Sequence, residues 1–313
     1  MTGSDWTVGD DSAGLRLDKY LAAPDRLGSR ARATAALERG KVFVNGAEAG
    51  PEARSVRLAA GDVVRVWMDR PGSATRRAVL GRTRDLRIVY EDDAIVVLNK
   101  APGILSVPLP SKSDARSVYK ELVRYLHTRG GRLPFVVHRI DRDTSGLVVF
   151  ATGAAVQERL TDQFKKHEPE RVYQAVVYGH PRPAAGTWRD RLVWDQKSLI
   201  QKEAGPRDSR GQEAVSDYRV IETFSDASLV EVRLITGKRN QIRMQARLHG
   251  HALVGERRYV GVTDPRPITF PRQALHAHKL SFRHPTTGEV VRFEAPLPDD
   301  LLQLIRRLRR ART

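Results

Sequence analysis

The sequence predicts an α+β protein, in which a small helix–helix–hairpin module precedes a larger domain with a mixed, largely antiparallel sheet flanked by helices. Two observations predict this class. Apolar residues at helical spacing precede an Asn-Gly turn near the N-terminus. From residue 86 onward, short apolar runs alternate with frequent turns, and few helical patterns are long. A basic stretch rich in Pro, Gly and Ser, residues 71–85, is typical of a linker between the two parts.

The N-terminal module begins with a short amphipathic helix. Residues 1–12 are polar, contain two glycines and are expected to be disordered. Leu17, Tyr20 and Leu21 then fall on one helical face. The sequence therefore predicts that packed structure starts near residue 13.

A second helix and a hairpin follow. Ser29 is a typical N-cap for a helix over residues 30–39, and the glycine after it ends that helix. Residues 41–46 alternate and end in Asn-Gly, the strongest short hairpin signal. Residues 63–67 predict a closing strand.

Composition limits the class of partner and the compartment. The formal net charge is +17, which favours a polyanionic partner, although only 11 of the 54 basic residues are lysine and genome composition contributes to such a bias. The chain has no cysteine, which excludes disulfides and zinc–thiolate sites and fits a cytoplasmic protein. Residues 1–5 lack the pattern of a secretory signal, and apolar runs such as 94–98 are too short to cross a bilayer.

One loop carries the main chemical signal. In residues 138–146, Asp141 lies between Arg139 and Arg142, and the polar turn 143–146 precedes an apolar run that predicts a buried strand. Because neighbouring cations favour the ionised carboxylate, Asp141 suits the role of a nucleophile. From spacing alone, the favoured interpretation is a loop whose aspartates cap backbone amides and whose arginines are solvated.

The segment resembles the His-Arg-Leu-Asp-x-x-Thr-Ser-Gly signature of RluA-type RNA pseudouridine synthases, with Ile140 in place of leucine. The resemblance implies an enzyme that breaks the uracil–ribose bond, rotates the base and rejoins it through carbon. That reaction involves no redox change and no metal, so no cofactor is expected. Asp141 would attack the sugar or the uracil ring, and Arg139 would fill the space that the flipped base leaves.

Two further segments resemble the same family. Residues 171–179 are similar to its Lys/Arg-x-Tyr-x-Ala-x-Val-x-Gly strand, which implies that Tyr173 lies beside the uracil and stacks on it or assists proton transfer. A tyrosine on a strand is otherwise more often part of a core. Residues 234–243 are similar to its Thr-Gly-Arg-x-His-Gln-Ile-Arg stretch, which implies that Arg243 forms a bidentate pair with Asp141.

Two positions depart from that last pattern. Lys238 replaces arginine and keeps its charge without the fork geometry, and Asn240 replaces histidine. We expect both changes to affect RNA contacts and substrate choice more than the nucleophile, with Lys238 still contacting RNA. Weaker likenesses flank these segments at residues 99–108 and 272–285, so the resemblance runs along nearly the whole chain in order.

The N-terminal module resembles the RNA-binding module first seen in ribosomal protein S-four, over about residues 13–70. The likeness implies phosphate contacts from Lys19, Arg30, Arg32 and Arg39. The predicted organisation is then a disordered start at 1–12, the RNA-binding module at 13–70, the linker at 71–85 and the catalytic domain at 86–313. Within the last, residues 196–212 carry no pattern and predict a surface loop, and residues 301–308 predict a helix with one apolar face.

These signals together predict a monomeric, membrane-free isomerase that acts on specific uridines, with large-subunit ribosomal RNA or its precursor particle as the favoured substrate. A synthase that acts on transfer RNA and a non-catalytic ribosome-assembly factor stay open as alternatives. An aspartic protease is excluded because a second aspartate motif is missing. The sequence contains no P-loop or dinucleotide fingerprint.

Overall fold

The computed structural model describes residues 4–68, 86–108, 115–129, 131–260 and 268–311. The chain divides into two compact units, one that includes the described residues up to 68 and one that includes residues 86–89 and those from 94 onward. Of the remaining residues, 90–93, the first two continue strand β5 (Ile88–Glu91) of the second unit's sheet. The predicted linker at 71–85 lies outside the described residues.

The N-terminal unit holds two helices and a four-stranded sheet in the order β1-β4-β2-β3. Its core includes Leu17, Tyr20 and Leu37, each at most 1% exposed. At the hairpin turn Asn45 and Gly46 both have positive φ, 53° and 79°, as a two-residue type I′ turn requires. The helices and the hairpin lie where the sequence predicts them. The elements are β1 (Ser4–Thr7), α1 (Leu17–Leu21), α2 (Arg30–Glu38), β2 (Val42–Val44), β3 (Ala47–Glu48) and β4 (Val63–Val66).

Residues 4–12 form regular structure, contrary to the disorder predicted for residues 1–12, of which 1–3 lie outside the described residues. Strand β1 pairs antiparallel with β4, and a 3-10 turn follows at Asp10–Ser12. Arg65 donates two hydrogen bonds to the Asp5 carboxylate across this pair. The sequence misled because the segment is mostly polar. An edge strand needs few apolar contacts besides its main-chain bonds, and here the half-buried Trp6 and the core residue Val8, 2% exposed, supply them.

The second unit is built on an 11-stranded sheet, as far as the described residues show. The strands follow the order β11-β10-β12-β13-β9-β14-β8-β6-β5, with β15 on β14 and β7 on β8. The strands are β5 (Ile88–Glu91), β6 (Ile95–Lys100), β7 (Phe135–Val136), β8 (Ser145–Ala151), β9 (Glu170–Tyr178), β10 (Ala185–Asp195), β11 (Ile200–Glu203), β12 (Gln212–Thr223), β13 (Ala227–Leu234), β14 (Leu275–Arg283) and β15 (Val290–Glu294).

Strand direction changes at one place in this sheet. Neighbours are antiparallel from β11 to β14 and again between β8 and β6, but β14 and β8 are parallel. Only two residue pairs, His276 with Ser145 and Ala277 with Gly146, register across this parallel junction. The predicted mixed, largely antiparallel sheet is confirmed. The candidate site lies beside the junction, because the Asp141 loop leads directly into β8.

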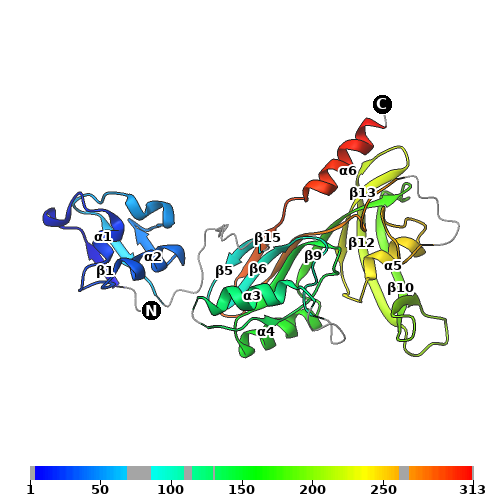
Figure 1. Cartoon of the computed structure of the whole chain (residues 1–313), viewed down its shortest axis with the longest axis horizontal. Helices are drawn as coiled ribbons and strands as arrows, with labels where there is room; N and C mark the ends of the chain where they lie inside the picture. The colour runs from blue at the N-terminus through cyan, green and yellow to red at the C-terminus, as the bar shows by residue number, and fades with distance from the viewer. Residues whose placement is uncertain (1–3, 69–85, 109–114, 130, 261–267, 312–313) are drawn as a thin grey trace. The chain divides into compact units, whose positions relative to one another are not determined.

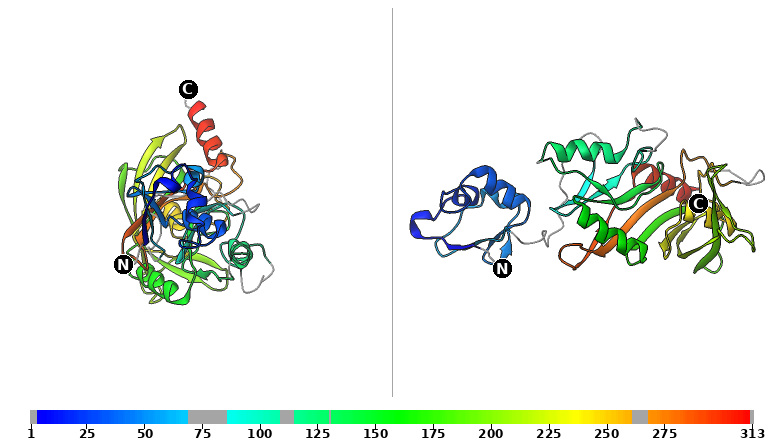
Figure 2. Two further views of the ribbon diagram at one scale, coloured as in Figure 1. Left: turned by 90° about the vertical axis from the view of Figure 1, so that its left-hand side faces the viewer. Right: turned by 90° about the horizontal axis from the view of Figure 1, so that it is seen from below.

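Four helices border the sheet in the described part of this unit. They are α3 (Val118–His127), α4 (Ala154–Lys165), α5 (Gln241–Leu248) and α6 (Asp299–Arg310). Helices α3 and α4 lie at the end of the sheet near β5 and β6, and α5 lies at the other end near β10 (Figures 1 and 2). The apolar face of α6 packs on core residues of β9 and β13, as its spacing predicts. No helix among the described residues is both long and apolar enough to pass through a membrane.

Residues 196–212 contain a strand that the sequence did not reveal. Ile200–Glu203 forms β11 and pairs with the end of β10, so the predicted patternless loop is wrong for this part. The strand was missed because it is short and polar, and its register is set by the hairpin turn at 196–199 rather than by an apolar face.

Candidate active site

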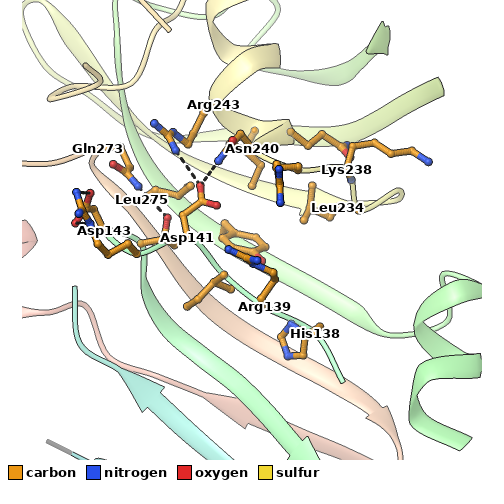
Figure 3. A pocket seen from close by; sticks show the side chains of 18 of the residues that line it. His138, Arg139, Asp141, Asp143, Leu234, Lys238, Asn240, Arg243, Gln273 and Leu275 are labelled. Carbon is orange, nitrogen blue, oxygen red and sulfur yellow. Dashed lines mark hydrogen bonds and ion pairs between the residues drawn. The ribbon is translucent and has the colours of Figure 1, made fainter. Parts of the chain in front are cut away.

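Five of the residues predicted for the site line a single cavity of about 1260 Å³: Arg139, Asp141, Tyr173, Lys238 and Arg243. Figure 3 shows Asp141 projecting into this cavity, with Arg243 and Asn240 close to its carboxylate. The other four predicted residues belong to the N-terminal unit, where all are exposed: Lys19, Arg30, Arg32 and Arg39.

The backbone on both sides of Asp141 is fixed by buried donors and acceptors. The Ser106 hydroxyl donates to the Ile140 carbonyl (2.8 Å) and accepts from the Ile140 amide (3.2 Å). On the other side, the buried Lys100 Nζ donates to the Arg142 carbonyl (2.8 Å) and also to the carbonyls of residues 101 and 104. Because these groups hold the main chain rather than the side chain, the carboxylate is positioned without being covered.

Gly146 is required by the junction below this loop. Its φ is +113°, and a Cβ there would lie 2.2 Å from the Ala277 carbonyl oxygen of β14. A Cβ atom cannot lie so close to an oxygen atom, so the loop can enter β8 only with a glycine, which lacks a side chain, at position 146. The glycine of the signature thus lets β8 and β14 meet directly behind Asp141.

The Asp141 carboxylate is bound through one oxygen. Oδ2 accepts hydrogen bonds from Arg243 Nη1 (3.0 Å) and Asn240 Nδ2 (2.6 Å), shown as dashed lines in Figure 3. No described residue donates to Oδ1, and the side chain is 27% exposed. The contacts fix the direction of the group while one oxygen stays open to the cavity.

The bidentate partner of Arg243 is Glu256, not Asp141 as the sequence led us to expect. Arg243 Nε and Nη2 bind the two Glu256 oxygens at 2.7 and 2.8 Å, which leaves Nη1 for Asp141. Burial of Glu256 would raise its pKa, but Arg243 and the backbone amides of residues 258 and 259 bring that pKa below its ordinary value. The same two carboxylates raise the pKa of Arg243 against the effect of its burial, so the guanidinium is a permanent cation.

Asn240 contacts the candidate nucleophile directly, a contact that the sequence did not predict. The Tyr259 hydroxyl donates to Asn240 Oδ1 (3.0 Å), so the amide nitrogen faces Asp141. The Gln201 amide of β11 in turn donates to the Tyr259 oxygen (3.0 Å). A chain of hydrogen bonds therefore leads from β11 to the Asp141 carboxylate.

Tyr173 forms part of the cavity floor. It extends from β9, is 9% exposed and packs in a buried apolar cluster with Ile140, Ile242 and Leu275. Burial raises the pKa of its hydroxyl, and the Asp141 carboxylate adds to that rise. The phenol therefore keeps its proton at neutral pH, and it presents an apolar ring with a polar tip to whatever enters.

His138 and His276, which lie in two of the segments that resemble the family, both have structural partners. His138 Nε2 accepts from the Val149 amide (3.1 Å), its ring stacks on Phe164 at 4.6 Å, and burial lowers its pKa to about 3. His276 bonds to the Ser145 hydroxyl at 3.0 Å, and burial lowers its pKa to about 4. Both rings are neutral at pH 7.

Known proteins share this fold and resemble this sequence. In the solved structure of the human RNA Pseudouridylate Synthase Domain Containing 4 protein, the matching chain has a TM-score of 0.60 and 20% identity, over 71% of this chain and 92% of that one. The fold is thus that of a pseudouridine synthase. The family model for RNA pseudouridylate synthase matches residues 94–248.

Similarity at the sequence level is higher. The uncharacterized RNA pseudouridine synthase YlyB of Bacillus subtilis is 36% identical over 99% of both chains. Ribosomal large subunit pseudouridine synthase D of Vibrio cholerae is 33% identical over 97% of this chain and 94% of its own length. The protein belongs to the RNA pseudouridine synthase family, and it is an isomerase.

Several residues of the site were missed by sequence reasoning. Glu256 follows an apolar stretch and resembles a turn residue, and its partner Arg243 lies 13 positions earlier, so no local spacing connects them. Tyr259 was missed for the same reason, because its partner Asn240 lies 19 positions earlier in the sequence. Lys100 and Ser106 lie inside the weak likeness at residues 99–108, which would have identified them had it been interpreted as support for the Asp141 loop.

Proposed function

We propose that the protein isomerises specific uridines of large-subunit ribosomal RNA to pseudouridine, with Asp141 as the nucleophile. One observation carries the assignment: Asp141 Oδ2 is held by Arg243 and Asn240, while Oδ1 is open to a cavity with an apolar floor. The printed name of the Vibrio cholerae relative, a ribosomal large subunit enzyme, supports the choice of RNA.

The reaction replaces the N1–C1′ bond of uridine by a C5–C1′ bond, and the proton lost from C5 balances the one gained by the ring nitrogen. Asp141 Oδ1 attacks either C1′ of the ribose or C6 of the uracil, and Arg243 keeps the carboxylate charged for that step. Because its phenol stays protonated, Tyr173 acts by stacking on the uracil and donating a hydrogen bond, not as a base at the outset. The walls of the cavity retain the detached base until it has turned.

Entry of the target requires that it leave the helical stack, which costs a few kcal/mol. Arg139 is exposed at the cavity mouth, and its planar guanidinium is suited to occupy the vacated place. Lys238, half-buried in the lining of the same cavity, contacts the RNA backbone. These roles make the cavity specific for a flipped base rather than for a free nucleoside.

The N-terminal unit serves as a separate S-four-type RNA-binding module over residues 13–70, in a protein that acts as a cytoplasmic monomer. Its four exposed cations bind phosphates of folded RNA: Lys19, Arg30, Arg32 and Arg39. Replacing each by alanine is expected to weaken binding to ribosomal RNA and to reduce the slope of log K against log salt by about 0.7–0.9 per lost contact. Arg54→Ala, an exposed arginine in the same unit, is the control.

The test of the reaction is a site-resolved pseudouridine map of unmodified ribosomal and transfer RNA after incubation with the purified protein. New signals at a few ribosomal uridines, absent with Asp141→Asn, are the expected result. Signals in transfer RNA alone would redirect the substrate assignment. Equal signals with the wild type and Asp141→Asn would remove Asp141 as nucleophile, and tight binding without product would favour the assembly-factor alternative.

A further inference from the structure

A second arginine in the cavity is buried without any acidic partner. Arg171 of β9 is 9% exposed, and its Nη2 donates a hydrogen bond to the Thr236 carbonyl at 3.3 Å. Its Nε is buried and has no hydrogen-bond partner. Among the residues that the structure describes, no carboxylate lies within ion-pair distance of this guanidinium. A buried cation in that condition destabilises a fold unless an anion joins it.

The surroundings supply no counter-charge. Lys238 lines the same cavity and adds a second cation, and His138 and His167, whose pKa values are lowered first by burial and then by the charge of Arg171, line it as well. Figure 3 shows His138 and Lys238 on the opposite side of Asp141 from Asp143. The only acids in the described lining are Asp141 and Asp143, which pair with Arg243 and Arg142. This end of the cavity is therefore cationic with nothing to neutralise it.

The donors that remain are those which a phosphate would use. The Nε–H of Arg171 is unpaired, and His138 accepts a backbone amide at Nε2, so its proton is on Nδ1. The planar guanidinium matches phosphate oxygens in pairs. Close packing also orients it: a Cβ on Gly237 would lie 2.4 Å from Arg171 Nη1, so the glycine leaves the space that the guanidinium occupies.

The position of Arg171 on β9 places its guanidinium near the uracil that Tyr173 is proposed to contact. Arg171 and Tyr173 are two residues apart on one strand and both line the cavity, so their Cα atoms are about 7 Å apart. We propose that Arg171, with His138 and Lys238, forms a phosphate subsite that binds a phosphodiester of the RNA immediately next to the target uridine. The inference rests on the proposed function, in which Tyr173 contacts the uracil.

The test uses the full-length protein and a short RNA that contains a uridine found in the map, made in versions with one uncharged methylphosphonate at each phosphate near the target. Every protein carries Asp141→Asn, so that no turnover disturbs the measured Kd. One linkage is expected to weaken binding about 10-fold with Arg171 present and less than 2-fold with Arg171→Met, the signature of a direct pair in a double-mutant cycle. Arg233→Met, on neighbouring β13 and paired with Asp217 outside the cavity lining, should keep the full 10-fold effect.

Two further measurements keep the proposal open to refutation. Gly237→Ala displaces the guanidinium without removing its charge and should also weaken the linkage effect. In the absence of RNA, inorganic phosphate should raise the Tm of the wild type more than that of Arg171→Met. An identical linkage profile in wild type and Arg171→Met, or an Arg171→Met chain that fails to fold, would overturn the subsite in favour of a purely structural role.

The outcomes for the subsite and for the isomerase are separable. If the map finds no product, the phosphate titration still tests Arg171, because it does not depend on turnover. A phosphate effect that depends on Arg171, without any product, would keep the subsite and remove the catalytic assignment. If product forms but neither the phosphate titration nor the methylphosphonate series depends on Arg171, the catalytic assignment stands and the subsite does not.

Discussion

Arg243 and Arg171 line one cavity and are equally buried, at 9% exposure each, but their charges are handled in opposite ways. Arg243 meets two carboxylates, and its pKa is raised in spite of burial. Arg171 meets none, and burial lowers its pKa. The difference teaches that burial alone does not define the role of a cation. A neutralised arginine positions another residue, whereas an arginine left without a counter-charge is available to a ligand.

The sharpest test of this contrast is the same substitution at both positions. Arg243→Met leaves Glu256 buried and unpaired, so we expect a loss of about 3–5 kcal/mol in the free energy of unfolding and no measurable turnover. Arg171→Met removes a charge that has no partner, and it should change stability by less than about 1 kcal/mol. Urea unfolding measures both. Equal losses of stability would break the comparison.

The next largest effect is expected at Asn240. Asn240→Asp places a second carboxylate where the amide now lies 2.6 Å from Asp141 Oδ2, so one of the two must take a proton at neutral pH. Turnover at pH 7 should fall by about 100-fold, equivalent to about 2.7 kcal/mol, and should recover partly as the pH rises. A rate–pH profile with Asn240→Ala as the uncharged control distinguishes this from simple loss of the hydrogen bond.

Glu256→Gln tests whether the stability that the Arg243–Glu256 pair contributes depends on the charge of Glu256. The folded pKa of Glu256 lies below its ordinary value of 4.5, so the stability that it contributes is complete above about that pH and is lost as the pH falls through the lowered value. The wild type should exceed the variant by about 2 kcal/mol at pH 7, with Asp141 as the remaining counter-charge, and this advantage should shrink in acid. Unfolding curves between pH 3 and pH 7 would show it, and a constant difference would contradict it.

The smallest effect is expected from Tyr259→Phe. It removes only the hydroxyl that orients Asn240, a neutral hydrogen bond of about 1 kcal/mol, so turnover should fall about 5-fold with little change in RNA affinity. The kcat and Kd of this variant measure how much the hydrogen-bond chain from β11 contributes. A loss confined to affinity would place Tyr259 in binding instead.

The sequence predicted the sheet class and the residues that share the cavity, because those signals are local. Asp141, Tyr173 and Arg243 each lie in a short segment with its own pattern, and the structure brings those segments together. What could not be predicted depends on contacts between distant segments. Glu256 has no local mark that would pair it with Arg243, and the order of β1 comes from its pairing with β4, whose partner residues are about 60 positions away.

The buried pair of Arg243 and Glu256 also limits how this chain can change over generations. Two well-packed apolar residues would hold the fold at least as well, so stability alone does not retain the pair. A single mutation at either position produces a protein in which the other residue is a buried charge without a partner. The two positions should therefore vary together among descendants, and a lineage that loses both should also lose the constraint on Asp141.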